Sequence, residues 1–427
     1  MRQQVITKVF SKLLFLLLIC CVNCTAQGQA PAAKTNKKGA KVSYNRIGKV
    51  EGHNILITKS VDLKGGECAL PENAILSFKG GVIMNGTLIG NKTRIKSKGG
   101  IFNNVEIKGN WDVRQISTDM FLDIKNENAL KNLFALTSPD VDNTIKIKKG
   151  DYILTAFRNN ERFLKVCDNT TIIIDGTITL TPNEFTNYTM LLVEGNNVVV
   201  KGNGIIKGDK FTHTGTTGEW GMGINVHHAQ DVHITGITVR ECWGDCIYVG
   251  DGSRNVLIEK CNIVHGRRQG ISITCADSVI IQKCVVTDVG GTNPEYAIDA
   301  EPNKGDTVNH IFIKDVRTVN CKGGFVAYGK AKDSSLGEIT IDNCTIEKCE
   351  KPPLSFNTCS RLLVKGCRLI DCRGINAIVC YNIPEVKIHK NQLKMTLGLK
   401  DMVKKYIRNS KKDQPVYYKN CKKIEID

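Results

Sequence analysis

Beyond residue 170, the apolar positions of the chain recur with a period much longer than one turn of helix. Each unit has an apolar residue, any residue and a second apolar residue, then two polar residues or glycine, then a small or apolar sixth residue. The units begin at Val198, Val232, Val256, Val279, Ile311, Ile339, Leu362 and Val386. The shortest interval is 23 residues, which indicates a coil of fixed circumference with loops inserted at some corners.

The segments within each coil alternate in polarity and are 4 to 6 residues long, so they predict β-strands rather than helices. Stacked coils place equivalent side chains about 4.8 Å apart. We therefore predict an all-β fold, a right-handed parallel β-helix that spans residues 119–427. The sixth positions are expected to form an interior ladder of Asn203, Ile237, Cys261, Cys284, Val316, Cys344, Cys367 and Asn391.

Other segments extend this architecture. Residues 51–118 carry short apolar alternations, which predict a small N-terminal β-rich cap or leading coils. Residues 126–136 carry apolar residues at helical spacing, which predicts one short capping helix. A second short helix is expected at 397–407, and a last coil strand at Ile424 and Ile426.

The helix at 126–136 and the later segment Lys149-Gly150-Asp151-Tyr152 resemble the N-terminal cap of the pectate-lyase-like β-helix superfamily. That superfamily includes polygalacturonases, phage tailspikes and several polysaccharide lyases. The resemblance covers most of residues 120–427 and implies a protein that acts on a glycan or oligosaccharide. Its tailspike members imply a homo-trimer as one form of assembly.

Three neighbouring strand segments, at 244–249, 269–274 and 297–301, carry side chains suited to catalysis. Their apolar residues lie two apart, so the alternate side chains point outward. The expected outward set is Tyr248, Ser272, Thr274, Asp299 and Glu301.

The acids of this face have a spacing that favours one mechanism. The Cα atoms of Asp299 and Glu301 are expected about 6.5 to 7 Å apart, with Asp245 two coils below, about 9 to 10 Å along the axis. An inverting glycosidase needs two carboxyl groups roughly 6.5 to 9.5 Å apart. We therefore predict a glycoside hydrolase with an inverting two-carboxylate mechanism and no cofactor.

Gly244-Asp245-Cys246-Ile247 is similar to the Asp-Asp-Cys-Ile motif of polygalacturonases, in which the acid before cysteine is the proton donor. The resemblance implies that Asp245 is the acid. The spacing of the carboxylates then predicts that Asp299 or Glu301 activates water, with the reverse assignment left open. Gln269 stands in place of that family's histidine, and Ile298-Asp299-Ala300 stands in place of its Arg-Ile-Lys. The cationic pair that would bind galacturonate is therefore missing.

Several side chains of the same strip are candidates for binding the glycan. Arg268 and Gln269 are expected to orient hydroxyl groups, and Trp243 and Tyr248 to stack on sugar rings. The other candidates are His265, Arg267 and Tyr296, with Glu219 and Trp220 on a Gly-rich loop one coil earlier.

Two alternative functions remain open. A polysaccharide lyase would use Arg267, Arg268 or Lys304 on a uronate, and Asp299 with Glu301 would then hold Ca²⁺. A C5-epimerase is a variant of this idea, because Tyr296, Asp299 and Glu301 resemble the Tyr and Asp-x-His arrangement of alginate epimerases. The other alternative is a non-catalytic surface or adhesive β-helix.

The first residues predict export. Residues 1–26 have the basic and apolar regions of a signal peptide, so we expect a periplasmic, cell-surface or secreted protein. Lipidation of Cys20, Cys21 or Cys24 would instead anchor the chain to a membrane. Residues 27–50 have no apolar periodicity and predict a disordered basic tether.

Charge and cysteine content narrow the class further. The net charge of +17 comes from residues 1–50, which carry +9, and residues 387–427, which carry +8. The residues between them have no net charge, so no nucleic-acid partner is predicted.

Three of the 18 cysteines lie in the predicted signal. Most of the others stand where Ile or Val would serve, so we predict buried free thiols rather than disulfides or a metal site.

Overall fold

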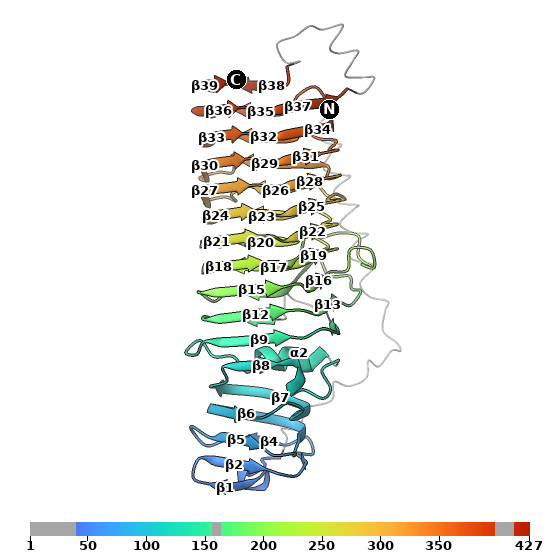
Figure 1. Ribbon diagram of the computed structural model, residues 1–427, viewed down its shortest axis with the longest axis vertical. Helices are drawn as coiled ribbons and strands as arrows, with labels where there is room; N and C mark the ends of the chain where they lie inside the picture. Colours follow the sequence, from blue (N-terminus) through green and yellow to red (C-terminus); the bar gives the residue numbers. More distant parts are fainter. Residues whose placement is uncertain (1–39, 126, 156–163, 398–413) are drawn as a thin grey trace, which may run out of the picture. The chain divides into compact units, whose positions relative to one another are not determined.

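The computed structural model describes residues 40–125, 127–155, 164–397 and 414–427. In this part of the chain, successive coils add one strand each to three parallel sheets (Figure 1). The predicted parallel β-helix is therefore confirmed. No helix within the described residues is long and apolar enough to cross a bilayer.

We name the three sheets of the coil by their order along the chain. The first sheet contains β8 (Gln115–Ser117), β9 (Asn143–Ile147), β12 (Thr170–Ile174), β15 (Val198–Gly202), β18 (Gln230–Thr235), β21 (Ser253–Glu259), β24 (Ala276–Gln282), β27 (Thr307–Lys314), β30 (Ser335–Asp342), β33 (Cys359–Lys365), β36 (Glu385–His389) and β39 (Lys423–Ile426). The second sheet contains β10 (Asp151–Leu154), β13 (Thr177–Leu180), β16 (Ile205–Lys207), β19 (Thr238–Arg240), β22 (Asn262–Val264), β25 (Val285–Thr287), β28 (Arg317–Val319), β31 (Thr345–Glu347), β34 (Arg368–Arg373) and β37 (Gln392–Thr396). The third, which we call the site sheet, contains β11 (Leu164–Val166), β14 (Asn187–Val193), β17 (Trp220–His227), β20 (Ile247–Gly250), β23 (Ile271–Ile273), β26 (Tyr296–Ala300), β29 (Gly323–Tyr328), β32 (Leu354–Asn357), β35 (Ile378–Tyr381) and β38 (Val416–Lys419).

The sequence repeat is the register of the first sheet. Val198, Val232, Val256 and Val279 are successive Cα partners, and the pairing continues through Ile311, Ile339, Leu362 and Val386. These side chains are buried. Each one removed from water stabilises the fold by about 1.5 to 3 kcal/mol, so a shift of one residue along any strand would be costly.

The two polar residues or glycines of each repeat unit lie at the corner where the chain leaves the first sheet. The residue just before the ladder position has a positive φ, for example 78° at Gly236 and 51° at Asn343. Glycine and asparagine adopt this left-handed conformation most readily, but Lys260, Lys283 and Lys390 also adopt it at this corner, so the coil imposes the conformation whichever residue stands there.

The interior ladder is confirmed from Ile237 to Cys367, where every member is buried. The Cys261 thiol lies 3.6 Å from the carbonyl oxygen of Ile234, so the cysteines also serve as weak donors. The two ends differ from the prediction. Asn203 is exposed, and half-buried Asn391 donates from Nδ2 to the Val364 carbonyl at 3.1 Å.

The fifteen cysteines from Cys68 to Cys421 are all free. Twelve are buried, and Cys167, Cys275 and Cys421 are half-buried. The prediction of buried free thiols is therefore confirmed for the described residues.

A separate seven-stranded sheet precedes the coils in the described chain. Its strands are β1 (Lys49–Glu51), β2 (Asn54–Ile57), β3 (Val61–Asp62), β4 (Glu67–Ala69), β5 (Ile75–Phe78), β6 (Ile83–Lys96) and β7 (Phe102–Trp111). The 3-10 turn η2 (Thr118–Met120) and helix α2 (Glu127–Phe134) follow. Helix α2 packs against β10 and β11 of the first coils, as the predicted capping helix should, and also against β7 of the seven-stranded sheet.

The predicted tether is too long at its C-terminal side. Residues 44–46 form the 3-10 turn η1 (Tyr44–Arg46), Ile47 is buried, and β1 begins at Lys49. The predicted signal peptide, the rest of the tether and nearly all of the helix expected at 397–407 lie outside the described residues. The last predicted strand is confirmed as β39, with Ile424 and Ile426.

Candidate active site

The outer face of the site sheet carries the predicted outward residues. Ile247, Ile271 and Ile298 are successive Cα partners and are buried, so the residues that follow them point away from the core. Tyr248, Ser272 and Asp299 are partners in the same register and form one outward column. The register places this column on the face opposite the buried isoleucines, as predicted, but Ser272 and Asp299 are only 1% and 2% exposed, so the column is not the open, solvent-facing surface that the sequence predicted.

Asp245 lies just before β20 and is fully buried. Its Oδ2 accepts a hydrogen bond from Arg268 Nη1 at 3.0 Å and another from Ser272 Oγ at 2.8 Å. Its Oδ1 has no partner within the described residues. Burial raises the pKa of Asp245, and the Arg268 charge and these hydrogen bonds oppose that shift.

Asp299 is 2% exposed and lies two strands further along the site sheet. Its Oδ2 accepts a hydrogen bond from Gln269 Nε2 at 2.6 Å, whereas its Oδ1 has no partner in the described chain. Burial raises the pKa of Asp299 well above its usual range, and the negative charge of Glu301 adds to the effect. Asp299 therefore favours its neutral form more strongly than Asp245 does.

Arg268 lies between these acids. Its Nη1 contacts Asp245, and its Nε lies 3.3 Å from Glu219 Oε2. Burial lowers the pKa of Arg268, but the charges of Asp245, Asp299, Glu219 and Glu301 raise it more. Burial also raises the pKa of Glu301. We call Glu219, Asp245, Asp299 and Glu301 the carboxylate cluster.

Gln269 and Tyr296 do not have the predicted role of contacting substrate from an open face. Gln269 is fully buried, and its Oε1 accepts a hydrogen bond from the Tyr296 backbone N–H at 2.7 Å while its Nε2 donates to Asp299. The Nε2 end of the amide therefore holds Asp299, and the Oε1 end fixes the Gln269 side chain to the Tyr296 backbone. Tyr296 is only 7% exposed, and its ring packs over Gly323.

Residues 208–218, which we call the strap, fold back over the coil next to the cluster. Asp209 holds the strap, since its carboxylate accepts hydrogen bonds from Tyr188 Oη at 2.6 Å and Asn183 Nδ2 at 2.7 Å. Its Oδ2 also lies 2.7 Å from His213 Nδ1. The side chains of Asp209 and His213 are fully buried. The sequence prediction missed this network, whose one signal was the 34-residue interval that contains the strap.

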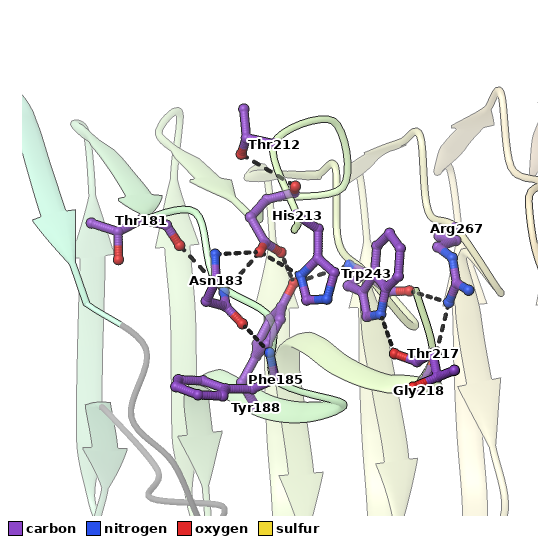
Figure 2. A network of polar contacts seen from close by, with 11 residues as sticks. Thr181, Asn183, Phe185, Tyr188, Thr212, His213, Thr217, Gly218, Trp243 and Arg267 are labelled. Atoms are coloured by element: carbon purple, nitrogen blue, oxygen red, sulfur yellow. Dashed lines mark hydrogen bonds and ion pairs between the residues drawn. The ribbon is translucent and has the colours of Figure 1, made fainter. Parts of the chain in front are cut away.

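Trp243 is not a free platform for a sugar ring. Figure 2 shows it between His213, whose ring lies 3.8 Å from the indole ring, and Arg267, whose guanidinium carbon lies 3.8 Å from that ring. Its Nε1 donates to Thr217 O at 3.1 Å, and Arg267 Nη1 donates to Gly218 O at 2.7 Å. Trp243 and Arg267 thus fasten the strap, which places Glu219 beside Arg268.

The remaining predicted residues divide between two places. Tyr248 stays on the outward column, half-buried, with its hydroxyl 2.6 Å from Thr274 Oγ1. His265 instead packs edge-to-face against Phe211 and lines a depression with Lys210 and Lys322. Among the described residues, no three His, Cys, Asp or Glu side chains are placed to hold one metal ion.

Comparisons with known proteins place the fold. The protein matches the family described as the right handed beta helix region over residues 147–331 and 223–396. The SPbeta prophage-derived uncharacterized protein YorA of Bacillus subtilis (strain 168) is 24% identical over an alignment of 267 residues that covers 54% of this chain and 44% of YorA. The uncharacterized protein YclG of the same strain is 29% identical over an alignment of 191 residues that covers 37% of this chain and 32% of YclG. The chain thus spans less than half the length of these relatives.

Some solved structures have a similar fold. The family 28 exopolygalacturonase of Yersinia enterocolitica is 10% identical, with a TM-score of 0.43, and the match covers 74% of this chain and 78% of that chain. PfbA, a surface adhesin of Streptococcus pneumoniae, is 12% identical, with a TM-score of 0.42, and the match covers 82% of this chain and 84% of that chain. The family match extends over more than half of the chain and agrees with the coil register of the three sheets. The chain therefore belongs to the right-handed β-helix family.

Proposed function

We propose that this protein is a glycoside hydrolase whose reacting groups lie in the carboxylate cluster. One observation carries the proposal: Asp245 and Asp299 are buried, and each has one oxygen held and one oxygen without a partner in the described chain. A half-satisfied buried carboxyl group costs stability, so it is uncommon where it serves only structure. Two such groups on one outward face support a site of acid and base catalysis.

The surroundings of the two acids support distinct roles. Asp299, whose pKa is raised most, is suited to donate a proton to the glycosidic oxygen as its bond to the anomeric carbon breaks. Asp245, stabilised as an anion by Arg268 and Ser272, is suited to take a proton from the water that attacks the anomeric carbon. This order reverses the one implied by the polygalacturonase motif. Attack from the face opposite the leaving group would invert the anomeric configuration.

The contacts of the two arginines weigh against the lyase alternative. Arg267 lies against Trp243 and donates to Gly218 O, and Arg268 pairs with Asp245 and Glu219. Both guanidinium groups are thus already paired or packed within the site, which favours a positioning role over the role of a base.

A panel of purified polysaccharides tests the proposal. We expect the protein to release new reducing ends from at least one glycan, with no rise in ultraviolet absorbance. Unsaturated products that absorb in the ultraviolet would overturn the hydrolase in favour of the lyase. Binding without any product would favour the adhesive alternative.

A further inference from the structure

A groove of about 200 Å³ lies on the outer face of the site sheet, next to the carboxylate cluster. It is lined chiefly by Trp220, Met222, Asn225, His227, Tyr248 and Asp251, from β17, β20 and the turn after β20. Tyr248 is the Cα partner of Ser272, which is the partner of Asp299. The groove therefore lies on the same face as the acids, only one strand away from Ser272.

Two features of the groove indicate a ligand. Trp220 is 53% exposed, so the face of its indole ring is open to a ligand. Asn225, one of the lining residues, is only 7% exposed, and its buried Oδ1 has no hydrogen-bond partner within the described residues. The Trp220 ring and the unpaired Asn225 Oδ1 together suit a ligand that has one apolar face and hydroxyl groups along its edge.

The size of the groove limits what it can hold. At ~30 Å³ for each water molecule, its volume equals about seven waters. That is the scale of one sugar ring rather than of a whole chain. A glycan that crosses the acids would place one of its residues here.

The charges around the groove select against anionic sugars. None of the described residues that line it is Lys or Arg. Its one basic side chain, His227, lies 3.4 Å from Asp251 Oδ2 and 3.6 Å from Glu194 Oε1. The nearest cation of the cluster, Arg268, already faces Asp245 and Glu219. A sugar carboxylate bound here would meet the negative charge of Asp251, and the described lining offers it no Lys or Arg.

We propose that this groove, the Trp220 subsite, binds one uncharged sugar residue, so that the substrate is a neutral glycan rather than a polyuronide. The inference rests on the proposed function, since it treats the adjacent acids as the cleavage point. Trp220 would stack on the apolar face of the ring, and Asn225 Oδ1 would accept a hydrogen bond from a sugar hydroxyl.

Binding to the Asp299→Asn variant, which should hold substrate without cleaving it, tests the subsite. The probes are neutral oligosaccharides from the panel, each paired with its C6-carboxylated counterpart, in titration calorimetry at low and moderate salt. We expect the neutral member to bind about ten-fold or more tightly, with a gap that narrows as salt screens the charges. Tighter binding of the carboxylated member would overturn the proposal.

Substitutions locate the binding. Trp220→Ala should weaken binding about ten-fold or more, as expected for loss of an aromatic anchor, and Trp220→Phe should restore much of it. Tyr418→Ala, an equally exposed aromatic in the last strand of the same sheet, is the control and should bind normally. Unchanged binding by Trp220→Ala would overturn the subsite.

The two proposals fail in different ways. Neutral-sugar binding that depends on Trp220, in a protein that cleaves no glycan, would refute the hydrolase and leave the subsite standing. Cleavage by the wild type with a KM unaffected by Trp220→Ala would refute the subsite and leave the hydrolase standing.

Discussion

Burial raises the pKa of both acids, but the neighbouring charge of Glu301 adds to the effect at Asp299, whereas the contacts with Arg268 and Ser272 oppose it at Asp245. Strand alternation alone predicted that Asp299 faces outward. It did not predict that Gln269 holds Asp299, because that contact depends on a backbone N–H 27 residues away, at Tyr296. Whether two side chains on neighbouring coils touch depends on both the strand register and the length of each side chain. A sequence repeat predicts only the register.

Replacing Glu301 by Gln tests the assignment of the acid. Loss of this charge lowers the pKa of Asp299, so the acid loses its proton at a lower pH. The alkaline limb of the pH dependence of kcat/KM should therefore move toward lower pH, while the acidic limb changes less. An alkaline limb that stays in place would show that Asp299 is not the proton donor.

At the scale of elements, the strap illustrates what a loop insertion adds to a regular coil. The constant part of the repeat predicted β15, β18 and β21 correctly, because each places a valine in the interior register. The strap has no period, and its partners Tyr188, Trp243 and Arg267 come from other coils. Its position was therefore beyond prediction from spacing.

Trp243→Ala should release the strap. Removal of a buried tryptophan costs about 3 to 5 kcal/mol, so the free energy of unfolding in urea should fall by that order and the strap should become sensitive to limited proteolysis. The matched control is Trp220→Ala, whose exposed side chain should change stability by no more than about 0.5 kcal/mol. Equal stabilities for the two variants would contradict the role given to Trp243.

At the scale of the whole molecule, a constant interval of about 23 residues was enough to predict the fold, because each coil must return to the same interior positions. The interval also placed Asp245 two coils from Asp299 and Glu301. It could not predict the seven-stranded sheet before the coils, where no unit repeats, or the place of helix α2 between that sheet and the first coil.

Thiol titration of the intact protein tests the interior ladder. In the native state, only the half-buried Cys167, Cys275 and Cys421 among the described cysteines should react. Buried thiols resist because the reagent cannot reach them, and burial also raises the pKa of several, for example to about 12 at Cys321 and Cys359. In denaturant without reductant, all fifteen should react. A smaller number would indicate disulfides and contradict the free-thiol ladder.

The most direct test of the account compares hydrolysis by Asp299→Asn with hydrolysis by Asp277→Asn, a control on the exposed outer face of the first sheet. Turnover should fall by about 10² to 10⁴ in the first variant and stay near wild type in the second. The raised pKa of Asp299 means that the folded state binds its proton more tightly than the unfolded state, so this side chain destabilises the fold as pH rises. Asp299→Asn should therefore be at least as stable as wild type at neutral pH. Wild-type turnover in a stable Asp299→Asn variant would contradict the account.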